Sequence, residues 1–215
     1  KRVAIGAGIL GTGGGGNPRH GELRAKQQLV DGHQLRVINL DELPDDALVV
    51  PMGGMGAPTV GIEKMSRGDE GKLAVQAVEE YLGQKVAATV PVEIGGGNSF
   101  APMIAAAQLG LPTVDADGMG RAFPEGQLVT LTLDGIGVSP MAIADERGNA
   151  IVLNTIDNFW VERFGRSLAV DFGAIAAGVG APLTARQVRE STILGSLSYA
   201  ELIGIAIRQA HTDKV

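Results

Sequence analysis

The chain has 215 residues, 45% of them hydrophobic and 20% charged, so it can bury a sizeable core and lacks the composition of a disordered protein. Its formal net charge of −6 argues against a nucleic-acid partner and against binding to an anionic membrane surface. Cysteine is absent, which excludes disulfides, thiolate nucleophiles and Cys-rich zinc sites.

Membrane and secretory segments are not expected either. No apolar run approaches the roughly 18 residues that a membrane helix needs, and no secretory signal pattern opens the chain, so we expect a cytoplasmic protein. Glycine is the unusual component, with 32 residues, roughly twice the average usage. These glycines are clustered and not periodic, which excludes a collagen-like repeat.

The first half of the chain alternates apolar runs, glycine-rich loops and helical patterns. Helices are expected over residues 19–32, 69–83 and 100–110, each ending at a glycine. In the first of them, Leu23, Leu29 and Val30 are expected to face inward. Strands are expected over residues 34–40, 47–51, 85–92 and 111–115, with glycine-rich loops between them and the helices.

The second half begins with β-like runs. Strands are expected over residues 127–133, 138–145 and 149–155, and helices return from Asp157. The segments 184–187 and 198–201 both match the capping box that starts a helix. The whole pattern predicts an α/β fold: a mixed, largely parallel sheet flanked by helices, glycine-rich loops at the carboxyl edge of the strands, and an antiparallel portion.

The first glycine cluster raises the question of a nucleotide. Residues 6–11, GAGILG, match Gly-x-Gly-x-x-Gly, but five of the six residues 11–16 are glycine, so a helix cannot start before Pro18. The first acidic residue that closes a strand is Asp41, too far along for this fingerprint, and we therefore expect no NAD. A phosphate-binding reading lacks the lysine that should follow the glycines. A flexible hinge and a loop whose N–H groups approach a ligand or oxyanion are the remaining interpretations.

Three further glycine-rich loops follow predicted strands, at residues 52–64, 93–99 and 116–125. In open α/β sheets, ligands bind beyond the carboxyl ends of the strands, so we expect these loops to form one site with Gly13 to Gly16. The substrate-binding residues that we expect there are Gly13, Gly14, Gly15, Gly16, Asn17, Glu63, Asn98 and Glu125.

The expected catalytic residues are Glu93, Asp115, Asp117 and Arg121. Burial can raise the pKa of a carboxylate toward neutrality, which suits a general base or acid, and an arginine can hold a substrate carboxylate. The alternatives are that Asp115 caps a turn, that Arg121 pairs with Glu125, and that Asn98 caps its helix. Asp115 and Asp117 are also compatible with a divalent metal, whereas the three histidines are too far apart to suggest a ligand set.

Four blocks of this sequence resemble those of one family. GILGTGGGGNP, VPMGGMGAPTVGIEK, EIGGGNS and LPTVDADGMGRAFPE are similar, in this order, to signature blocks of the S-methyl-thiohydantoin desulfurase-like family. The similarity extends from about Gly6 to Trp160, and one departure is Asn17, where the family more often has aspartate. Members are often encoded near hydantoinase/oxoprolinase proteins and are longer, with a second, β-rich domain.

The resemblance implies hydrolysis of a five-membered cyclic amide or thioamide ring with loss of a sulfur leaving group. It implies an α/β N-terminal domain over residues 1–175 and a helical segment over residues 176–215 that leads into a β-rich domain outside this chain. The expected partners are a small cyclic amide substrate and a second copy of the chain, in a homo-oligomer. A non-catalytic subunit that supports a hydantoinase/oxoprolinase-like partner is the alternative.

Overall fold

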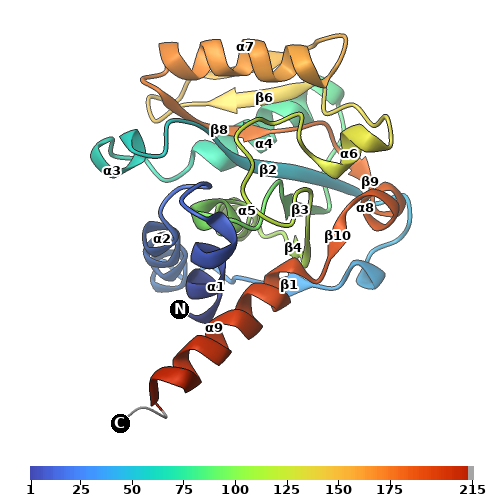
Figure 1. Cartoon of the computed structure of the whole chain (residues 1–215). Coiled ribbons are helices and arrows are strands. Elements are labelled where there is room, and N and C mark those ends of the chain that lie inside the picture. The colour runs from blue at the N-terminus through green and yellow to red at the C-terminus, as the bar shows by residue number, and fades with distance from the viewer. Residues whose placement is uncertain (213–215) are drawn as a thin grey trace.

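The computed structural model of the chain describes residues 1–212, and its centre is a mixed β-sheet with helices on both faces (Figure 1). Its strands lie in the order β1-β4-β3-β2-β8-β6-β7, and β9 also pairs with β2. These strands are β1 (Val37–Ile38), β2 (Leu48–Gly56), β3 (Ala88–Pro91), β4 (Thr113–Val114), β6 (Met141–Ala144), β7 (Ala150–Leu153), β8 (Ile175–Val179) and β9 (Leu183–Thr184). A second, two-stranded sheet consists of β5 (Ala116–Asp117) and β10 (Ile193–Leu194).

The main sheet has a parallel half and an antiparallel half. Strands β1, β4, β3 and β2 pair in parallel, whereas β8, β6 and β7 continue the sheet in antiparallel pairs. The predicted mixed α/β sheet with an antiparallel portion is therefore confirmed, although parallel pairing extends over only part of it. The change from parallel to antiparallel pairing falls between β2 and β8, which run in opposite directions.

Helices cover both faces of the sheet. They are α1 (Arg2–Gly11), α2 (Pro18–Val30), α3 (Val60–Glu63), α4 (Glu70–Leu82), α5 (Ala101–Leu109), α6 (Thr130–Leu133), α7 (Asn158–Asp171), α8 (Ala185–Ser191) and α9 (Ser196–Thr212), with 3-10 turns η1 (Leu40–Glu42) and η2 (Gly96–Ser99). None of the helices among residues 1–212 is long and apolar enough to cross a bilayer.

The side chains of strand β2 alternate between two hydrophobic clusters, one on each face of the sheet. Val49 packs in one cluster with Val188 of α8, whereas the next residue, Val50, packs in another with Val75 of α4. Successive side chains on a strand point to opposite faces, so one strand serves both layers. Helix α7 covers the part of the sheet near β6 and β8, where Val161 packs against Ile143. Helix α9 packs against α1 and projects from the body (Figure 1).

Several local predictions are confirmed. Helix α4 ends at Gly83 and α5 ends at Gly110, both in the left-handed conformation with φ of 65° and 72°. The capping box at 184–187 is formed, because Thr184 and Gln187 exchange hydrogen bonds at the start of α8. These features depend on φ preferences and contacts within one turn, which the local sequence determines.

Other local predictions are wrong. Leu23, Leu29 and Val30 are exposed on α2, and the buried positions of this helix include Glu22 and Ala25. Residues 127–133 contain the short helix α6 in place of a strand, and 52–56 belong to β2 in place of a loop. The segment 198–201 lies inside α9, which begins at Ser196.

The Gly-x-Gly-x-x-Gly pattern lies inside helix α1, where a dinucleotide fingerprint requires a turn between a strand and a helix. The pattern serves packing here. A Cβ at Gly6 would lie 1.9 Å from the carbonyl oxygen of Ala200, and one at Gly204 would lie 2.0 Å from that of Arg2. Helices α1 and α9 therefore approach each other through glycines on both sides.

Candidate active site

The tetraglycine segment packs directly on the loop that follows β3. Gly15 has a φ of +71°, and a Cβ there would lie 2.2 Å from the carbonyl oxygen of Gly95. The N–H groups of Gly97 and Asn98 donate to the carbonyl oxygens of Gly16 and Gly15 at 3.0 and 2.9 Å. The segment consists of glycines because the main chain of residues 95–98 packs directly against it, so the interpretation as a flexible hinge is wrong.

This contact leaves two main-chain donors unused. Among residues 1–212, neither the N–H of Gly15 nor that of Gly16 has a protein acceptor, although both residues line cavities. Backbone N–H groups in a glycine loop are suited to hold a negative oxygen. The interpretation of Gly13 to Gly16 as a ligand loop therefore applies best to Gly15 and Gly16, since Gly13 lines neither cavity.

A cavity of about 540 Å³ lies at the carboxyl ends of β2 and β3, between the tetraglycine segment and α7. Most of its wall is apolar and comes from elements far apart in the sequence. It is lined by residues 14–16, 51–56, the loop 119–126, α7 and the start of β8. The predicted convergence of the glycine-rich loops on one edge therefore appears in the structure, with 53–56 contributed by a strand.

Glu93 is the buried carboxylate of this cavity. The residue is 5% exposed, lies two positions after the end of β3, and lines the cavity wall. Its Oε1 accepts a hydrogen bond from Asn98 Nδ2 at 2.5 Å, and its Oε2 accepts one from the N–H of Phe123 at 3.2 Å. Burial raises the pKa of Glu93 to about 7; the two hydrogen bonds oppose this shift, and the charge of Asp117 adds to it.

Asn98 connects Glu93 to strand β2. Its Oδ1 accepts from the N–H of Gly54 at 2.7 Å, while its Nδ2 donates to Glu93. The amide therefore faces the carboxylate with its nitrogen and forms no other hydrogen bond among the described residues. The alternative that Asn98 only caps its helix is wrong, because α5 begins after Phe100.

The loop 119–126 closes the cavity, and its second half is attached on two sides. Toward β3, the N–H of Phe123 donates to Glu93. Toward α7, the N–H of Gly126 donates to Glu162 Oε2 at 2.9 Å, and Arg166 donates to the carbonyl oxygen of Pro124 at 2.9 Å. Glu162 and Arg166 also pair with each other across one turn of α7, at 2.5 Å. Sequence reasoning missed this pair, although its i,i+4 spacing in a predicted helix was a visible signal.

Asp117 has a different position from the one expected of a catalytic base. It is fully buried and lines neither cavity. Its Oδ2 accepts from three main-chain N–H groups at 2.6 to 3.1 Å, and its Oδ1 accepts from the Ser196 hydroxyl at 2.5 Å. Burial raises the pKa of Asp117, and these four hydrogen bonds oppose the shift. The carboxylate holds the loops and the start of α9 together.

Asp115 lies on the same side of the chain, as alternation predicts, but serves helix α9. Its Oδ1 accepts from the N–H groups of Leu197 and Ser198 at 2.7 and 3.2 Å, and its Oδ2 accepts from the Ser198 hydroxyl at 2.5 Å. A carboxylate that accepts from the first N–H groups of a helix is a cap, here supplied from about 80 residues away. Asp115 lines neither cavity.

The remaining predicted residues lie apart from Glu93. Arg121 is exposed and, among residues 1–212, forms no ion pair, so the alternative that it pairs with Glu125 is wrong. Glu63 is exposed on α3 and lines no cavity, while Glu125 is exposed at the rim of the large one. Asn17 caps α2 by accepting from the N–H of Arg19.

Among the described residues, no group of three or more His, Cys, Asp or Glu could hold a metal, so Asp115 and Asp117 do not form such a set.

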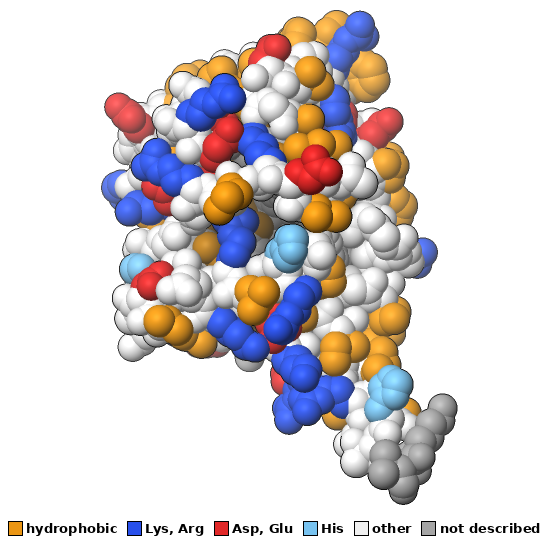
Figure 2. Space-filling view, turned by 90° about the vertical axis from the view of Figure 1, so that its left-hand side faces the viewer, with side chains coloured by type: hydrophobic (Ala, Val, Ile, Leu, Met, Phe, Trp, Pro, Cys, Tyr) orange, Lys and Arg blue, Asp and Glu red, His pale blue; other side chains and the backbone are white. Residues whose placement is uncertain are grey.

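A second, smaller cavity of about 190 Å³ adjoins the first on the side of α2 and α3. Figure 2 looks at this side and shows a hollow bordered by lysine, arginine and histidine side chains. The polar residues on its wall include His20, Arg24, Lys64, Glu70 and Glu146. Sequence reasoning missed His20 and Arg24 as site residues, although their i,i+4 spacing on a predicted helix places them on one face.

Residues 1–155 match the family model described as S-Me-THD-like, N-terminal domain. The chain belongs to the S-Me-THD-like family. Residues 156–215 match the C-terminal domain of the same family, so the boundary between the two matches falls between β7 and α7. The resemblance seen in the loop sequences is thereby confirmed.

One solved structure supports the fold of this S-Me-THD-like chain. A crystal structure of a protein from Chromobacterium violaceum is 26% identical to it and superposes with a TM-score of 0.81. The superposition covers 97% of this chain and 60% of that one, so this chain spans 60% of the length of that protein. No curated protein matches the chain significantly.

Proposed function

We propose that the chain carries the reactive site of a hydrolase that acts on a five-membered cyclic amide or thioamide ring, such as an S-methyl-thiohydantoin. The observation that carries this proposal is Glu93: a buried carboxylate with a pKa of about 7 on the wall of a largely apolar cavity. A general base works best when its pKa lies near the operating pH. Family membership supports the choice of ring.

The proposed reaction uses water, the Glu93 carboxylate and main-chain N–H groups of this cavity. Glu93 takes a proton from a water molecule, whose oxygen bonds to the ring carbon that carries the S-methyl group. The negative charge that develops on the ring is held by main-chain N–H groups, among them those of Gly15 and Gly16, which have no protein acceptor among residues 1–212. The carbon–sulfur bond then breaks, the proton passes from Glu93 to the leaving sulfur, and the products are a hydantoin and methanethiol.

The surroundings of Glu93 suit this role. Asn98 donates to one carboxylate oxygen and is itself fixed by Gly54, so the side chain is held in one orientation. The other oxygen receives a single, longer hydrogen bond, from Phe123. An oxygen with so few donors in an apolar wall keeps its basicity, because nothing else stabilises its charge.

The test is turnover of S-methyl-thiohydantoins by the full-length protein, with methanethiol release and hydantoin formation measured together. Glu93→Gln should lower kcat/KM by at least about a hundredfold, as loss of a general base does. Glu80→Gln is the control, because Glu80 is exposed on α4 and lines neither cavity, and it should keep activity. Equal turnover by Glu93→Gln and the unmodified protein would refute the proposal. Turnover that appears only with a hydantoinase/oxoprolinase-like partner would favour the supporting-subunit alternative.

A further inference from the structure

The smaller cavity has charged residues that the proposed reaction does not use. It lies between α2, α4, α5 and the β6–β7 turn. A substrate bound near Glu93 would lie next to this cavity. What this cavity could bind depends on which of its charged side chains still have free hydrogen-bonding capacity, so each is considered in turn.

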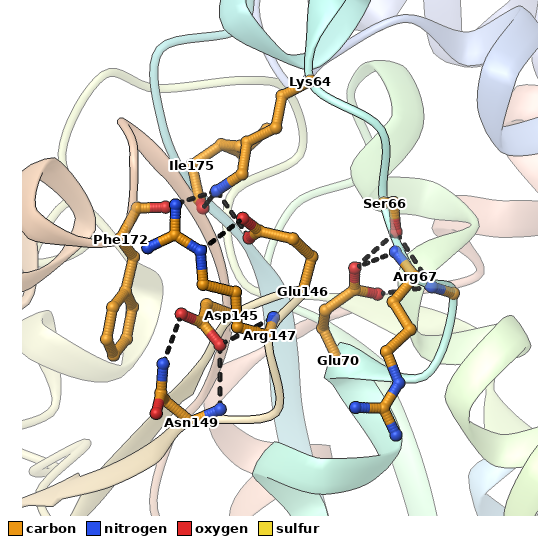
Figure 3. A network of polar contacts seen from close by, with 11 residues as sticks. Lys64, Ser66, Arg67, Glu70, Asp145, Glu146, Arg147, Asn149, Phe172 and Ile175 are labelled. Carbon is orange, nitrogen blue, oxygen red and sulfur yellow. Dashed lines mark hydrogen bonds and ion pairs between the residues drawn. The ribbon is translucent and has the colours of Figure 1, made fainter.

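The ammonium group of Lys64 has no free hydrogen-bonding capacity. It donates to the carbonyl oxygens of Phe172 and Ile175, the latter at 3.1 Å, and pairs with Glu146 at 2.7 Å (Figure 3). An ammonium group has three N–H donors, and all three have acceptors here. Lys64 therefore holds the segment after α3 against the start of β8.

The carboxylates on this wall are also occupied. Glu70 accepts from the Ser66 hydroxyl and from the N–H groups of Arg67 and Gly68, at 2.6 to 2.9 Å (Figure 3). Asp145 accepts three hydrogen bonds within its own turn, from Arg147 and Asn149. These carboxylates shape loops, and a cation entering the cavity would have to displace their donors.

Arg24 and His20 differ from the others. They lie one turn apart on α2, and among residues 1–212 neither side chain forms a hydrogen bond with the protein. The closest carboxylate oxygen to Arg24 is Glu70 Oε2 at 3.6 Å, which is an ion pair but too long for a hydrogen bond. Glu70 thus keeps the guanidinium over the cavity while its five N–H donors stay free.

The two cavities share part of their walls. Eight residues line both: the glycines Gly15, Gly16, Gly53 and Gly54, which carry no side chain, together with Asn98, Met52, Pro58 and Ile175. Asn98 contacts Glu93 on one side, so the wall between the reactive carboxylate and the cationic side is one residue thick. A ring in the large cavity could send a short substituent past the glycines.

We propose that the substrate ring bears a side chain ending in a carboxylate, which Arg24 and His20 bind in the smaller cavity. This inference rests on the proposed function and adds the substrate class. The planar guanidinium fork matches a carboxylate in a bidentate pair, and an imidazole supplies one N–H donor in either neutral tautomer. An uncharged side chain of the same length would leave both donors without a charged acceptor.

The test compares two S-methyl-thiohydantoins that differ in one group, one made from glutamate and the other from glutamine. Their side chains have the same length and shape and differ in charge. The protein should favour the carboxylate compound by at least about tenfold in kcat/KM. Arg24→Gln and His20→Gln should each remove most of that preference. Each should raise KM for the carboxylate compound and leave kcat unchanged. Arg19→Gln is the control, because Arg19 lies on α2, pairs with Glu22 and lines no cavity.

A binding experiment separates this inference from the proposed reaction. Calorimetry with the two hydantoin products should show tighter binding of the carboxylate form, and Arg24→Gln should abolish the difference. Equal affinities for both products, or a preference that Arg24→Gln leaves intact, would overturn the anionic substrate class even if both compounds are hydrolysed. Binding with the predicted preference but no hydrolysis would support the class and refute the reaction.

Discussion

Glu93, in the loop after β3, and Asp117, at the end of β5, are two buried carboxylates, near enough for the charge of Asp117 to raise the pKa of Glu93. They differ in their partners. Asp117 accepts four hydrogen bonds and touches no cavity, while Glu93 accepts two and lines one. Burial is common to both, so the number of donors and the access to a cavity separate a carboxylate that holds loops from one that can move a proton.

The largest expected effect concerns the support beneath Glu93. Gly15→Ala would place a Cβ 2.2 Å from the Gly95 carbonyl oxygen at a φ of +71°, so we expect a loss of about 4 kcal/mol in the free energy of unfolding. Gly13→Ala is the matched control, with a φ of +96° but no atom within 4 Å, and should cost about 1 to 2 kcal/mol. Denaturant unfolding of both variants measures the difference. Equal losses would mean that the packing of the two glycine loops contributes little.

Asp117→Asn tests the other side of the comparison. In this variant an NH₂ group replaces one carboxylate oxygen, so hydrogen-bond donors that now point at that oxygen would face another donor. We therefore expect a loss of about 3 kcal/mol in the free energy of unfolding. The folded fraction should keep a normal kcat, in contrast to Glu93→Gln. Stability and turnover are measured on the same preparation. A hundredfold fall in kcat with unchanged stability would reverse the two roles.

The pH dependence of stability sharpens the comparison for Glu93. Its pKa is raised from 4.5 to about 7, so the folded state holds a proton in this range that the unfolded state has lost. Stability is therefore lost as the pH rises from 4.5 toward 7, and the penalty persists above it. Glu93→Gln should be more stable than the unmodified protein by about 2 kcal/mol at pH 8.5 and similar at pH 4.5. Thermal unfolding at the two pH values measures this, and a variant that is less stable at pH 8.5 would contradict it.

The smallest expected effect concerns the loop over the cavity. Arg166→Gln removes the ion pair to Glu162 and the hydrogen bond to Pro124, so we expect a loss of about 1 kcal/mol in stability and a several-fold rise in KM. Arg163→Gln is the control on the same helix, since Arg163 stacks on Trp160. An equal KM for the two variants would show that the attachment of the loop does not affect binding.

The candidate site was partly predictable. Glu93 and Asn98 follow a strand and lie in a glycine-rich loop, and a strand end in an α/β sheet is where a site is expected. The same rule also selected Asp115, Asp117 and Arg121, because the rule gives the edge of the sheet and says nothing about partners. Contacts of Ser196, Leu197 and Ser198, some 80 residues further along, occupy Asp115 and one oxygen of Asp117. Main-chain N–H groups of the neighbouring loops occupy the other oxygen of Asp117.

The sequence by itself determined the features that depend on neighbouring residues. The helix ends at Gly83 and Gly110 and the capping box at Thr184 follow from φ preferences and from contacts within one turn. Tertiary structure decided the rest: which face of α2 is buried, the antiparallel insertion of β8 beside β2, and the contact of Gly15 with Gly95. Each of these depends on which distant segment packs against the chain, and that choice is made by the burial of whole surfaces and not by any local pattern.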